Sequence, residues 1–447
     1  MQDKFKNRIT TIILAAGKGV RMNSSIPKVM HKIAGQSIFE YTLEQGRSIS
    51  ENDIVVVINE SLSSNSHYKT LKKQYKFSEV IQINPNGTGD AVKQAFDNTQ
   101  IQDTVLILYG DTPFIKTETI KKMLLEMNSG ANLVSLGFYC KEPNEYGKLI
   151  IDDDNNILAI SEDRNFKIKK TGTTLCNGGI LLAKKQLLAS FFKKMKLSKS
   201  NADSKEFYLT DIVEYANIHD YRSSYIISDS EEVLGVNTKV DLAEAEKIIQ
   251  SKIKSELLKS GVTIIMPETT YISKKAYIEN DVVIYPNVYI GNDVVIKKGT
   301  NIYPFSHLEG VTINENCNIG PYARIRPNSN VEKEAKIGNF VELKNAKIGK
   351  KTTAAHLAYL GDVKIGQQSN VGAGTIFCNY DGEKKHYSEV GDKVFIGSNS
   401  SIISPVKIGD QATIGAGSVI TKDVNSRDLA IAREKQINFP EKSKIKK

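Results

Sequence analysis

The chain has 447 residues, which is enough for two or three domains that each bury a core. It is 40% hydrophobic and 25% charged, and its net charge of +9 does not gather beside clustered aromatic residues, so we expect no nucleic-acid binding. The four cysteines form no C-x-x-C pair, which disfavours a disulfide framework or a zinc site and favours a reducing cytoplasm. No apolar run approaches the roughly 20 residues that span a bilayer, so we expect a cytoplasmic protein without membrane insertion.

Short β-rich runs alternate with amphipathic helical patterns over the first part of the chain. This alternation predicts an α/β fold with a largely parallel, doubly wound sheet. Such sheets bind ligands beyond the carboxyl ends of their strands. The predicted strands are 11–16, 53–59, 79–84, 104–110, 132–138 and 178–183, and the clearest helices are 38–49 and 88–98.

The first predicted strand leads directly into a glycine-rich loop, TIILAAGKGVRM at 11–22. Gly17 and Gly19 have the spacing of a dinucleotide-binding fingerprint, but Met22 stands where the third glycine would be. Glycines let backbone amides approach a phosphate or a base closely, and Arg21 and Lys28 add positive charge nearby. The loop therefore predicts a site for one nucleotide.

A single helix is predicted over 238–260, with Gly261 as its stop signal. Beyond it, aliphatic residues recur every six positions, from Ile272 to Leu308, from Ile313 to Leu343 and from Ile396 to Ile420. This period predicts a parallel β-helix of hexapeptide repeats and excludes an ordinary sandwich. The repeat is interrupted at 376–392, where we expect a loop that carries function. The predicted domains are 1–237, a linker helix at 238–261, and 262–447 with a basic tail.

Motifs from both halves of the chain match one known family in its order. They are LAAGKGVRM (14–22), PKVMHKIAG (27–35), NGTGDA (86–91), LYGDTP (108–113), GVN (235–237), IGPYARIRP (319–327), GNFVELK (338–344), HLAYLGD (356–362), VGAGT (371–375), CNYDG (378–382) and AIAR (430–433). The chain resembles the bifunctional GlmU family, which joins an N-acetylglucosamine-1-phosphate uridyltransferase to a glucosamine-1-phosphate N-acetyltransferase. The resemblance implies a Rossmann-like nucleotidyltransferase domain followed by a left-handed β-helix.

The resemblance also implies roles for residues of the first half. Asp111, which ends a predicted strand, would bind Mg²⁺ together with Asn237; taken alone, Asp111 could equally be a turn residue. Lys28 and Arg21 would neutralise phosphate, since uridylyl transfer needs charge neutralisation more than a general base. The nucleotide- and sugar-binding set is Leu14, Ala15, Ala16, Gly17, Arg21, Lys28, Gln82, Gly87, Thr88, Tyr109, Gly110, Asp111, Gly147, Glu162, Asn177 and Asn237.

Three departures from the family pattern lie in this first site. Val20 replaces the usual threonine, 86–90 reads Asn-Gly-Thr-Gly-Asp where Leu-Gly-Thr-Gly-His is usual, and Cys176 precedes Asn177-Gly178 where Asn-Thr-Gly is common. None removes a charge from the reacting phosphate. The second lies beside the base, so it bears on the preference for uridine over thymidine.

Acetyl transfer to an amine needs a proton acceptor, and His356 is the candidate general base. Alone, a structural histidine would be the simpler interpretation, and the matched motif reverses that. By resemblance, Arg326, Lys344, Tyr359 and Asn370 hold the sugar phosphate, and Ala373, Asn379, Tyr380, Ser398, Ala416 and Arg433 hold acetyl-CoA. Cys378 raises an acyl-enzyme alternative, but direct attack by the amine is favoured.

The family is homotrimeric through side-by-side β-helices that form the acetyl sites between chains, so the expected partners are further copies and the substrates UTP, acetyl-CoA and glucosamine-1-phosphate. Two other hypotheses stay open. The chain could be a nucleotidyltransferase whose repeats serve only assembly or regulation, or a non-catalytic scaffold or sensor. His356 with Arg326 and Lys344 argues against the first, and Lys28 with Asp111 against the second.

Overall fold

The computed structural model describes residues 9–83, 85–141, 144, 146–153, 156–162, 173–194 and 206–442. The chain divides into two compact units, the first ending at Glu246 and the second beginning at Lys247. The division falls within helix α8 (Lys239–Lys259). The domain limits 1–237, 238–261 and 262–447 stay predictions, and most of the basic tail lies outside the described residues.

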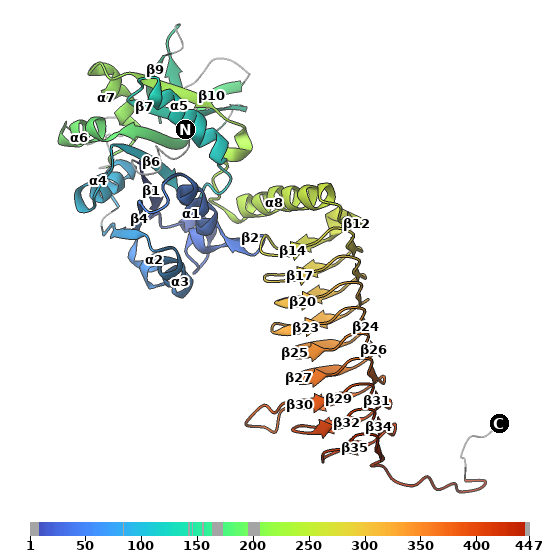
Figure 1. The fold of residues 1–447 in the computed structure, drawn as a ribbon. Helices are drawn as coiled ribbons and strands as arrows, with labels where there is room; N and C mark the ends of the chain where they lie inside the picture. Colours follow the sequence, from blue (N-terminus) through green and yellow to red (C-terminus); the bar gives the residue numbers. More distant parts are fainter. Residues whose placement is uncertain are drawn as a thin grey trace. The chain divides into compact units, whose positions relative to one another are not determined.

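Unit 1 is built on one sheet whose strands follow the order β11-β7-β10-β6-β1-β4-β5 (Figure 1). The central strand β1 pairs in parallel with β4 and β6, whereas β10 runs antiparallel to β6 and β7. The bounds are β1 Ile9–Ala15, β4 Ile54–Ile58, β5 Ser78–Ile81, β6 Thr104–Tyr109, β7 Leu133–Lys141, β10 Thr173–Lys184 and β11 Ser223–Ile227. The predicted doubly wound sheet is therefore present, with one reversed strand.

Helices cover both faces of this sheet because alternate strand residues point to opposite sides. Ile13 of β1 belongs to a core shared with α1, α3 and α5, and Ile12 to a core shared with α4, α6 and α7. The helices are α1 Ile38–Ile49, α2 Glu60–Ser64, α3 Ser66–Tyr75, α4 Thr88–Asn98, α5 Thr117–Asn128, α6 Lys185–Lys194 and α7 Asp211–Ile218. The predicted limits of α1 and α4 are confirmed.

Shorter elements complete unit 1. A hairpin of β8 (Lys148–Ile151) and β9 (Ile157–Ser161) extends from β10, and β2 (Lys32–Ile33) pairs with β3 (Gln36–Ser37). Neither hairpin is evident from hydrophobic periodicity. Single 3₁₀ turns cover Val20–Met22, Lys28–Met30 and Ser230–Val233. None of the helices in the described ranges is long and apolar enough to cross a bilayer.

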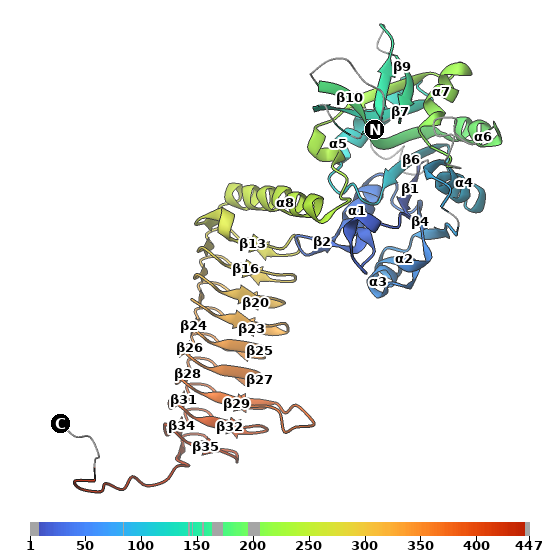
Figure 2. The same cartoon turned by 180° about the vertical axis from the view of Figure 1, so that it is seen from behind.

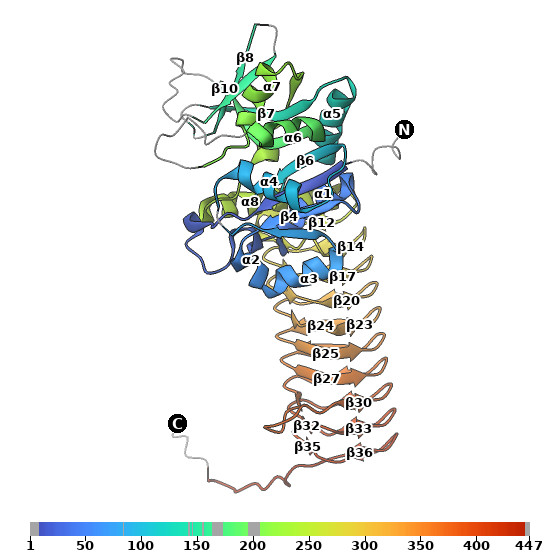
Figure 3. The same cartoon turned by 90° about the vertical axis from the view of Figure 1, so that its left-hand side faces the viewer.

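Unit 2 is a left-handed parallel β-helix in which short strands stack coil upon coil (Figures 1 and 3). The aliphatic residues predicted at every sixth position, from Ile272 to Leu343 and from Ile396 to Ile420, are all buried in one continuous core. Gln250 of α8 caps the first coil, since its amide both donates to and accepts from the backbone of Ile272 at 2.8 and 3.1 Å. The hexapeptide period therefore corresponds to one large aliphatic side chain of each repeat in the core, which smaller side chains such as Val282 and Ala323 also enter.

Strands of the β-helix fall into two sheets, which we call sheet C and sheet D. Sheet C contains β12 Thr263–Ile264, β15 Val283–Ile284, β18 Asn301–Ile302, β21 Asn318–Ile319, β24 Lys336–Asn339, β26 Thr353–His356, β28 Asn370–Val371, β31 Phe395–Ile396, β34 Thr413–Ile414 and β36 Leu429–Ala430. Sheet D contains β13 Tyr271–Ile272, β14 Tyr277–Ile278, β16 Tyr289–Ile290, β17 Val295–Ile296, β19 His307–Leu308, β20 Val311–Ile313, β22 Arg324–Ile325, β23 Ser329–Val331, β25 Glu342–Ile348, β27 Tyr359–Ile365, β29 Ile376–Cys378, β30 Ser388–Val390, β32 Ser401–Ile403, β33 Lys407–Ile408 and β35 Val419–Ile420. A 3₁₀ turn covers Pro267–Thr269.

One loop leaves the stack of coils between β29 and β30 (Figure 2). The predicted loop at 376–392 is therefore shorter than expected, because its two ends continue the coils as strands. Tyr380 and Lys385 pair as an isolated bridge within it. We call residues 379–387 the hairpin loop.

Candidate active sites

The loop after β1 lies at the carboxyl end of the sheet, as predicted for a nucleotide site. The backbone N–H of Gly110 donates to the carbonyl of Leu14 at 2.9 Å, and the Asn59 amide donates to that of Ala16 at 3.0 Å. Gly19 adopts a positive φ of 62°, and a Cβ there would lie 2.7 Å from the Cβ of Lys28. A glycine is therefore needed for the loop to pass close to Lys28.

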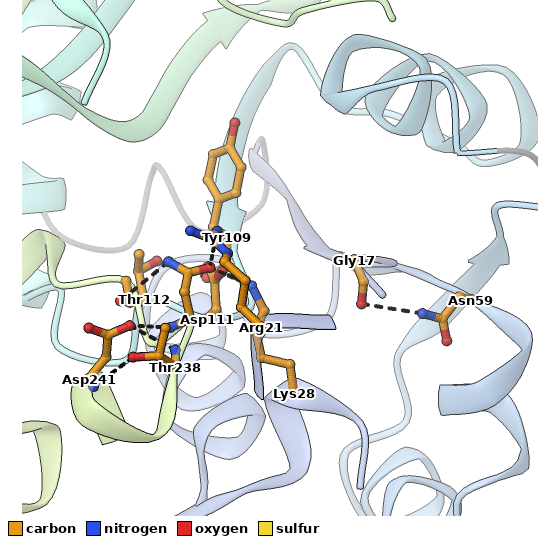
Figure 4. Close-up of polar contacts among 11 residues, drawn as sticks. Gly17, Arg21, Lys28, Asn59, Tyr109, Asp111, Thr112, Thr238 and Asp241 are labelled. Atoms are coloured by element: carbon orange, nitrogen blue, oxygen red, sulfur yellow. Dashed lines mark hydrogen bonds and ion pairs between the residues drawn. The ribbon is translucent and has the colours of Figure 1, made fainter. Parts of the chain in front are cut away.

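Lys28 is the centre of a charged cluster at this end of the sheet (Figure 4). Its ammonium group pairs with the carboxylate of Asp111 and lies 3.1 Å from Oδ1 of Asn237. The guanidinium of Arg21 donates to the same Asn237 oxygen at 3.1 Å. The side chains of Lys28 and Asp111 are only 13% and 16% exposed, so solvent screens their interaction weakly.

Asn237 is held in this cluster by its neighbours in the chain. The backbone N–H of Val236 donates to the carbonyl of Asp111 at 2.9 Å. The Asp241 carboxylate accepts from the N–H groups of Asn237 and Thr238 at 2.9 and 2.8 Å, and so caps the start of α8. The segment of Asp111 and the segment of Asn237 are thus joined through their backbones, and this contact does not depend on one flexible side chain.

The oxygen atoms of Asp111 and Asn237 fit the chemistry of a Mg²⁺ site. Both are hard donors, and both lie within hydrogen-bonding reach of one cationic group, Lys28 Nζ, so they converge on one point. Within the described ranges, no group of three or more His, Cys, Asp or Glu side chains gathers as a metal cluster. A magnesium ion here would therefore take most of its ligands from phosphate and water.

A cavity of about 310 Å³ opens beside the cluster. Lys28 and Asp111 line it where it meets the charged cluster, and Gln82, Gly87 and Thr88 line it at the start of α4, which we call the α4 end. A phosphate group suits the first end and a base suits the second. Further predicted residues that line it are Leu14, Ala15, Ala16, Gly17 and Tyr109, and the lining residues that sequence reasoning missed are Val29, Pro85, Ala91 and Glu206.

The α4 end of the cavity is held in place by the segment at Phe207, which is distant in the chain. Gly87 has a φ of 99°, and a Cβ there would lie 2.4 Å from the carbonyl oxygen of Phe207. Phe207 donates its N–H to Asn86 at 2.7 Å and accepts from Gly89 at 2.8 Å. The Oγ1 of Thr88 accepts from the N–H of Leu209 at 3.1 Å. The loop before α4 is therefore clamped by its backbone.

The three residues predicted to hold the sugar lie together. The N–H of Asn177 donates to the carbonyl of Gly147 at 2.7 Å, and a Cβ on Gly147 would lie 3.0 Å from the Glu162 carboxylate. Burial raises the pKa of the Tyr109 phenol, and the Glu162 and Asp111 carboxylates raise it further. Tyr109 is therefore electrostatically coupled to both the predicted sugar residues and the charged cluster.

The structure shows the surroundings of the residues that depart from the family pattern. Val20 is 76% exposed, and Cys176 is buried with its sulfur 3.7 Å from Nζ of Lys148. Asp90 accepts a hydrogen bond of 2.8 Å from the Gln82 amide. Asp90 therefore touches a residue that lines the cavity.

In unit 2, His356 belongs to a column of residues along sheet C. The register pairs Asn339 with His356, Asn370 with Thr353, and Phe395 with both Asn370 and Thr413. Continued by the same offsets, it stacks Asn339, His356, Ala373, Ser398 and Ala416 on successive coils. The guanidinium of Arg433 donates to the carbonyl of Ala416 at 2.6 Å. His356 and three of the residues predicted for acetyl-CoA, Ala373, Ser398 and Ala416, thus form one line, whereas Asn379 and Tyr380 lie in the hairpin loop.

The imidazole of His356 is exposed, and its Nδ1 is hydrogen-bonded to Oδ1 of Asn339. An amide oxygen only accepts, so Nδ1 carries the proton and Nε2 of the neutral ring is left as the proton acceptor. A cavity of about 450 Å³ adjoins the ring and is also lined by Tyr303, Lys336 and Asn339.

A second group of predicted residues lies on sheet D. Arg326 donates to Glu342 at 3.1 Å, and Lys344 lies 3.7 Å from the carboxylate of Asp362. The same carboxylate accepts from the Asn379 amide, and a Cβ on Gly361 would lie 2.5 Å from the Tyr359 hydroxyl and 2.7 Å from the Asn379 nitrogen. Lys344 and Asn379 therefore meet at Asp362, with Tyr359 beside them at Gly361 and Arg326 bonded to Glu342.

The hairpin loop brings a further cation to this group. Contact with the Lys344 ammonium lowers the pKa of Lys385 below its ordinary value of 10.5. The carboxylate of Asp381 accepts from His386 at 2.6 Å and from the N–H groups of Glu383 and Lys384, and these bonds hold its pKa well below the usual range. Two ammonium groups held side by side form a site for a dianion.

The two groups of unit 2 are not brought together within one chain. His356 ends β26 in sheet C and Tyr359 begins β27 in sheet D, with the exposed Leu357 at the corner between them. The cavity beside His356 is lined by none of Arg326, Lys344 and Tyr359, and Asn370 lies on sheet C with His356. His356 and Asn370 therefore lie on sheet C, and the other sugar-phosphate residues, Arg326, Lys344 and Tyr359, lie on sheet D.

Sequence reasoning missed Asn339, Asp362 and Lys385. Asn339 and Asp362 each bond to a predicted residue on another coil, His356 and Asn379, at a separation of 17 residues. Lys385 lies beside the Lys344 ammonium. A signal existed, because polar side chains at corners of a β-helix that are separated by one coil stack on one another.

The fold and the two sites define a nucleotidyltransferase unit joined to a hexapeptide-repeat transferase. The family model described as a MobA-like NTP transferase domain matches residues 11–147, and that described as bacterial transferase hexapeptide (six repeats) matches 275–310 and 387–422.

The chain belongs to the bifunctional GlmU family. The relative named bifunctional protein GlmU from Wolbachia pipientis wMel is 42% identical over 433 residues, which cover 96% of this chain and 97% of the relative. Its namesake from Bartonella quintana (strain Toulouse) is 39% identical over 431 residues, 96% of this chain and 94% of that relative.

Proposed function

We propose that the chain makes UDP-N-acetylglucosamine in two steps. Unit 2 transfers an acetyl group from acetyl-CoA to glucosamine-1-phosphate, and unit 1 then transfers a uridylyl group from UTP to the product and releases pyrophosphate. The observation that carries this proposal is that each unit holds its own convergent set of charged side chains, around Lys28 in one and around Lys344 in the other.

Uridylyl transfer is proposed to occur at the cavity beside Lys28. The phosphate oxygen of N-acetylglucosamine-1-phosphate attacks the α-phosphorus of UTP, and the bond to pyrophosphate breaks. The attacking oxygen is already ionised at neutral pH, so the protein must position the groups and neutralise charge. Lys28 and Arg21 meet at the same Asn237 oxygen, which places two positive charges where the phosphates would lie.

Magnesium is the proposed cofactor, held by Asp111 and Asn237, and it would supply neutralisation of phosphate charge. Lys28 bonds to the oxygens of both residues, so its ammonium group lies where it would contact a phosphate beside them. Gln82, Gly87 and Thr88 receive the base, and Gly147, Glu162 and Asn177 receive the sugar.

Acetyl transfer is proposed to use His356 as the general base. The free Nε2 accepts the proton that the amine of glucosamine-1-phosphate loses as nitrogen attacks the thioester carbon and coenzyme A thiolate leaves. Asn339 fixes the tautomer that leaves Nε2 unprotonated. Arg326, Lys344 and Lys385 hold the phosphate dianion. Cys378 is a half-buried residue at the end of β29 and takes no part in this direct attack.

A homotrimer completes this second site in the proposal. His356 lies on a different sheet from Arg326, Lys344 and Tyr359 in one chain, so a neighbouring copy must supply one of the two groups. The corner between them also carries an exposed apolar column, which consists of Phe305, Tyr322, Phe340 and Leu357 at 51%, 46%, 54% and 58% exposure. Its rings stack at 4.9 and 5.0 Å. Exposed contiguous apolar surface is typical of an interface.

Initial rates on the purified full-length protein test the proposal. With glucosamine-1-phosphate, acetyl-CoA, UTP and Mg²⁺, we expect free coenzyme A, pyrophosphate and UDP-N-acetylglucosamine to form. Uridylyl transfer to N-acetylglucosamine-1-phosphate without any acetylation of glucosamine-1-phosphate would support the alternative of a monofunctional nucleotidyltransferase. The cytoplasmic location stays a prediction.

A further inference from the structure

The side-chain amide of Gln82 lies at the α4 end of the nucleotide cavity, where its NH₂ group donates hydrogen bonds to two acceptors. The side chain lines the cavity although the residue is only 6% exposed. Its Nε2 donates to Oδ2 of Asp90 at 2.8 Å and to the carbonyl of Gly87 at 3.4 Å. The backbone N–H of Gln82 donates to Ile58 at 2.8 Å, so the residue is also fixed at its base.

These partners determine which way the amide faces. A carboxylate and a backbone carbonyl can only accept, so both hydrogens of the Gln82 amide group are directed to Asp90 and Gly87. The reverse orientation would place Oε1 against the Asp90 carboxylate. Two acceptor oxygens would then repel each other with no hydrogen between them. Oε1 is thereby left for a ligand, and within the described ranges no residue donates a hydrogen bond to it.

Asp90 is itself placed for this task. It lies in the first turn of α4, where a helix favours negative charge, and the Gln94 amide donates to the same Oδ2 at 2.8 Å. The turn before α4 is clamped to Phe207 through Gly87 and Gly89. The carboxylate is therefore a fixed acceptor.

An amide that offers only an oxygen distinguishes pyrimidine bases. Uracil and thymine carry a hydrogen on N3 and can donate it to Oε1. Cytosine presents a lone pair on N3, which would face Oε1 and leave both acceptors unpaired. A site built around one hydrogen bond rejects an analogue that lacks the matching group more strongly than an apolar pocket can.

We propose that Asp90 is a positioning residue that fixes Gln82 as a hydrogen-bond acceptor, and that the site thereby selects nucleotides with an N3–H base over cytosine nucleotides. The proposal rests on the proposed function of unit 1 as a uridyltransferase. Asp90 contributes nothing to the choice between uracil and thymine, because both bases donate from N3.

The test compares kcat/KM for UTP and CTP, with N-acetylglucosamine-1-phosphate, in the full-length protein and in Asp90→Asn. The asparagine can present its own NH₂ to Gln82, so the glutamine amide can turn over. We expect the UTP-to-CTP ratio to fall about tenfold or more, and the UTP-to-dTTP ratio to stay within about twofold. Asp97→Asn is the matched control, because Asp97 is an exposed carboxylate on the same helix that pairs with Lys93.

Acetyl transfer by unit 2 reports whether the variant is folded. A UTP-to-CTP ratio of Asp90→Asn within about twofold of wild type would overturn the proposal. If the variant transfers neither nucleotide, the ratio of the dissociation constants for UTP and CTP, measured by calorimetry, is judged by the same limits. A wild type that uses no nucleoside triphosphate contradicts the proposed function, whereas an active wild type with an unchanged ratio in the variant contradicts only the role of Asp90.

Discussion

Nζ of Lys28 lies 3.1 Å from Oδ1 of Asn237, although 209 positions separate the two residues in the sequence. The contact joins the loop after β1 to the start of α8, and the Asp111 carboxylate is the third member. One lysine thus gathers the two oxygens that are proposed to hold Mg²⁺.

Asn237→Ala tests this arrangement. It removes one proposed ligand and the shared partner of Lys28 and Arg21, so we expect the Mg²⁺ concentration for half-maximal uridylyl transfer to rise at least about tenfold. A magnesium titration of the initial rate measures it. An unchanged half-maximal concentration would exclude Asn237 as a ligand.

Gly87→Ala should weaken binding of the base at the α4 end of the cavity. The new methyl group would lie 2.4 Å from the carbonyl oxygen of Phe207, at a φ of 99° that side chains rarely adopt. We expect the KM for UTP to rise about tenfold or more, because the clamped loop must move.

The matched control is Gly130→Ala. Gly130 has nearly the same φ, 101°, but the nearest atom to an added Cβ is 3.5 Å away. Both variants carry the backbone strain, and only Gly87→Ala carries the clash. Equal effects of the two on the KM for UTP would contradict the proposed role of this loop.

The lowered pKa of Lys385 predicts an alkaline limit to sugar-phosphate binding. As pH rises through this lowered pKa, Lys385 loses its charge before an ordinary lysine would, so the KM for glucosamine-1-phosphate should rise below pH 10.5. Lys344→Met removes the repelling ammonium and should move this rise to higher pH, although it raises the KM at neutral pH.

Lys384→Met is the control for this pH profile, because Lys384 is an exposed neighbour in the same hairpin loop. We expect it to leave the alkaline rise of KM where it is in the wild type. A Lys344→Met profile that coincides with the wild-type profile would show that the two ammonium groups do not act together.

The apolar column should hold copies of the chain together. Tyr322→Glu places a charge between Phe305 and Phe340, whose rings stack on either side of it. We expect sedimentation to show monomers, with acetyl transfer reduced at least about tenfold and uridylyl transfer retained. Leu125→Glu, at an exposed position of α5, should leave the assembly intact. A trimeric Tyr322→Glu variant would exclude the column as the interface.

The sequence predicts much of this architecture because the spacing of its hydrophobic residues follows directly from the geometry of strands, helices and β-helix coils. Ile284, Ile302 and Ile319 fall on the hexapeptide period because each hexapeptide turns one large aliphatic side chain into the core, and all three are fully buried. Asp111 is predictable because it follows the end of β6 by two residues, at the edge where parallel strands place ligands. The hairpin of β8 and β9 has no comparable period and is not foreseen.

Contacts between coils account for what the sequence does not predict. Asp362 contacts both Lys344 and Asn379 because the lengths of the coils place the three residues on successive coils. The pairing of Asp90 with Gln82 likewise depends on a turn between β5 and α4, where sequence shows a departure from a motif but not its partner.

Paired rates of Lys28→Ala and His356→Ala test the central claim, that one chain carries two independent active sites. Both reactions are measured on the same preparations of full-length protein. We predict that Lys28→Ala lowers uridylyl transfer at least about 100-fold and keeps acetyl transfer within about twofold, and that His356→Ala does the reverse. Full acetyl transfer by His356→Ala, or loss of both reactions in either folded variant, would contradict the account.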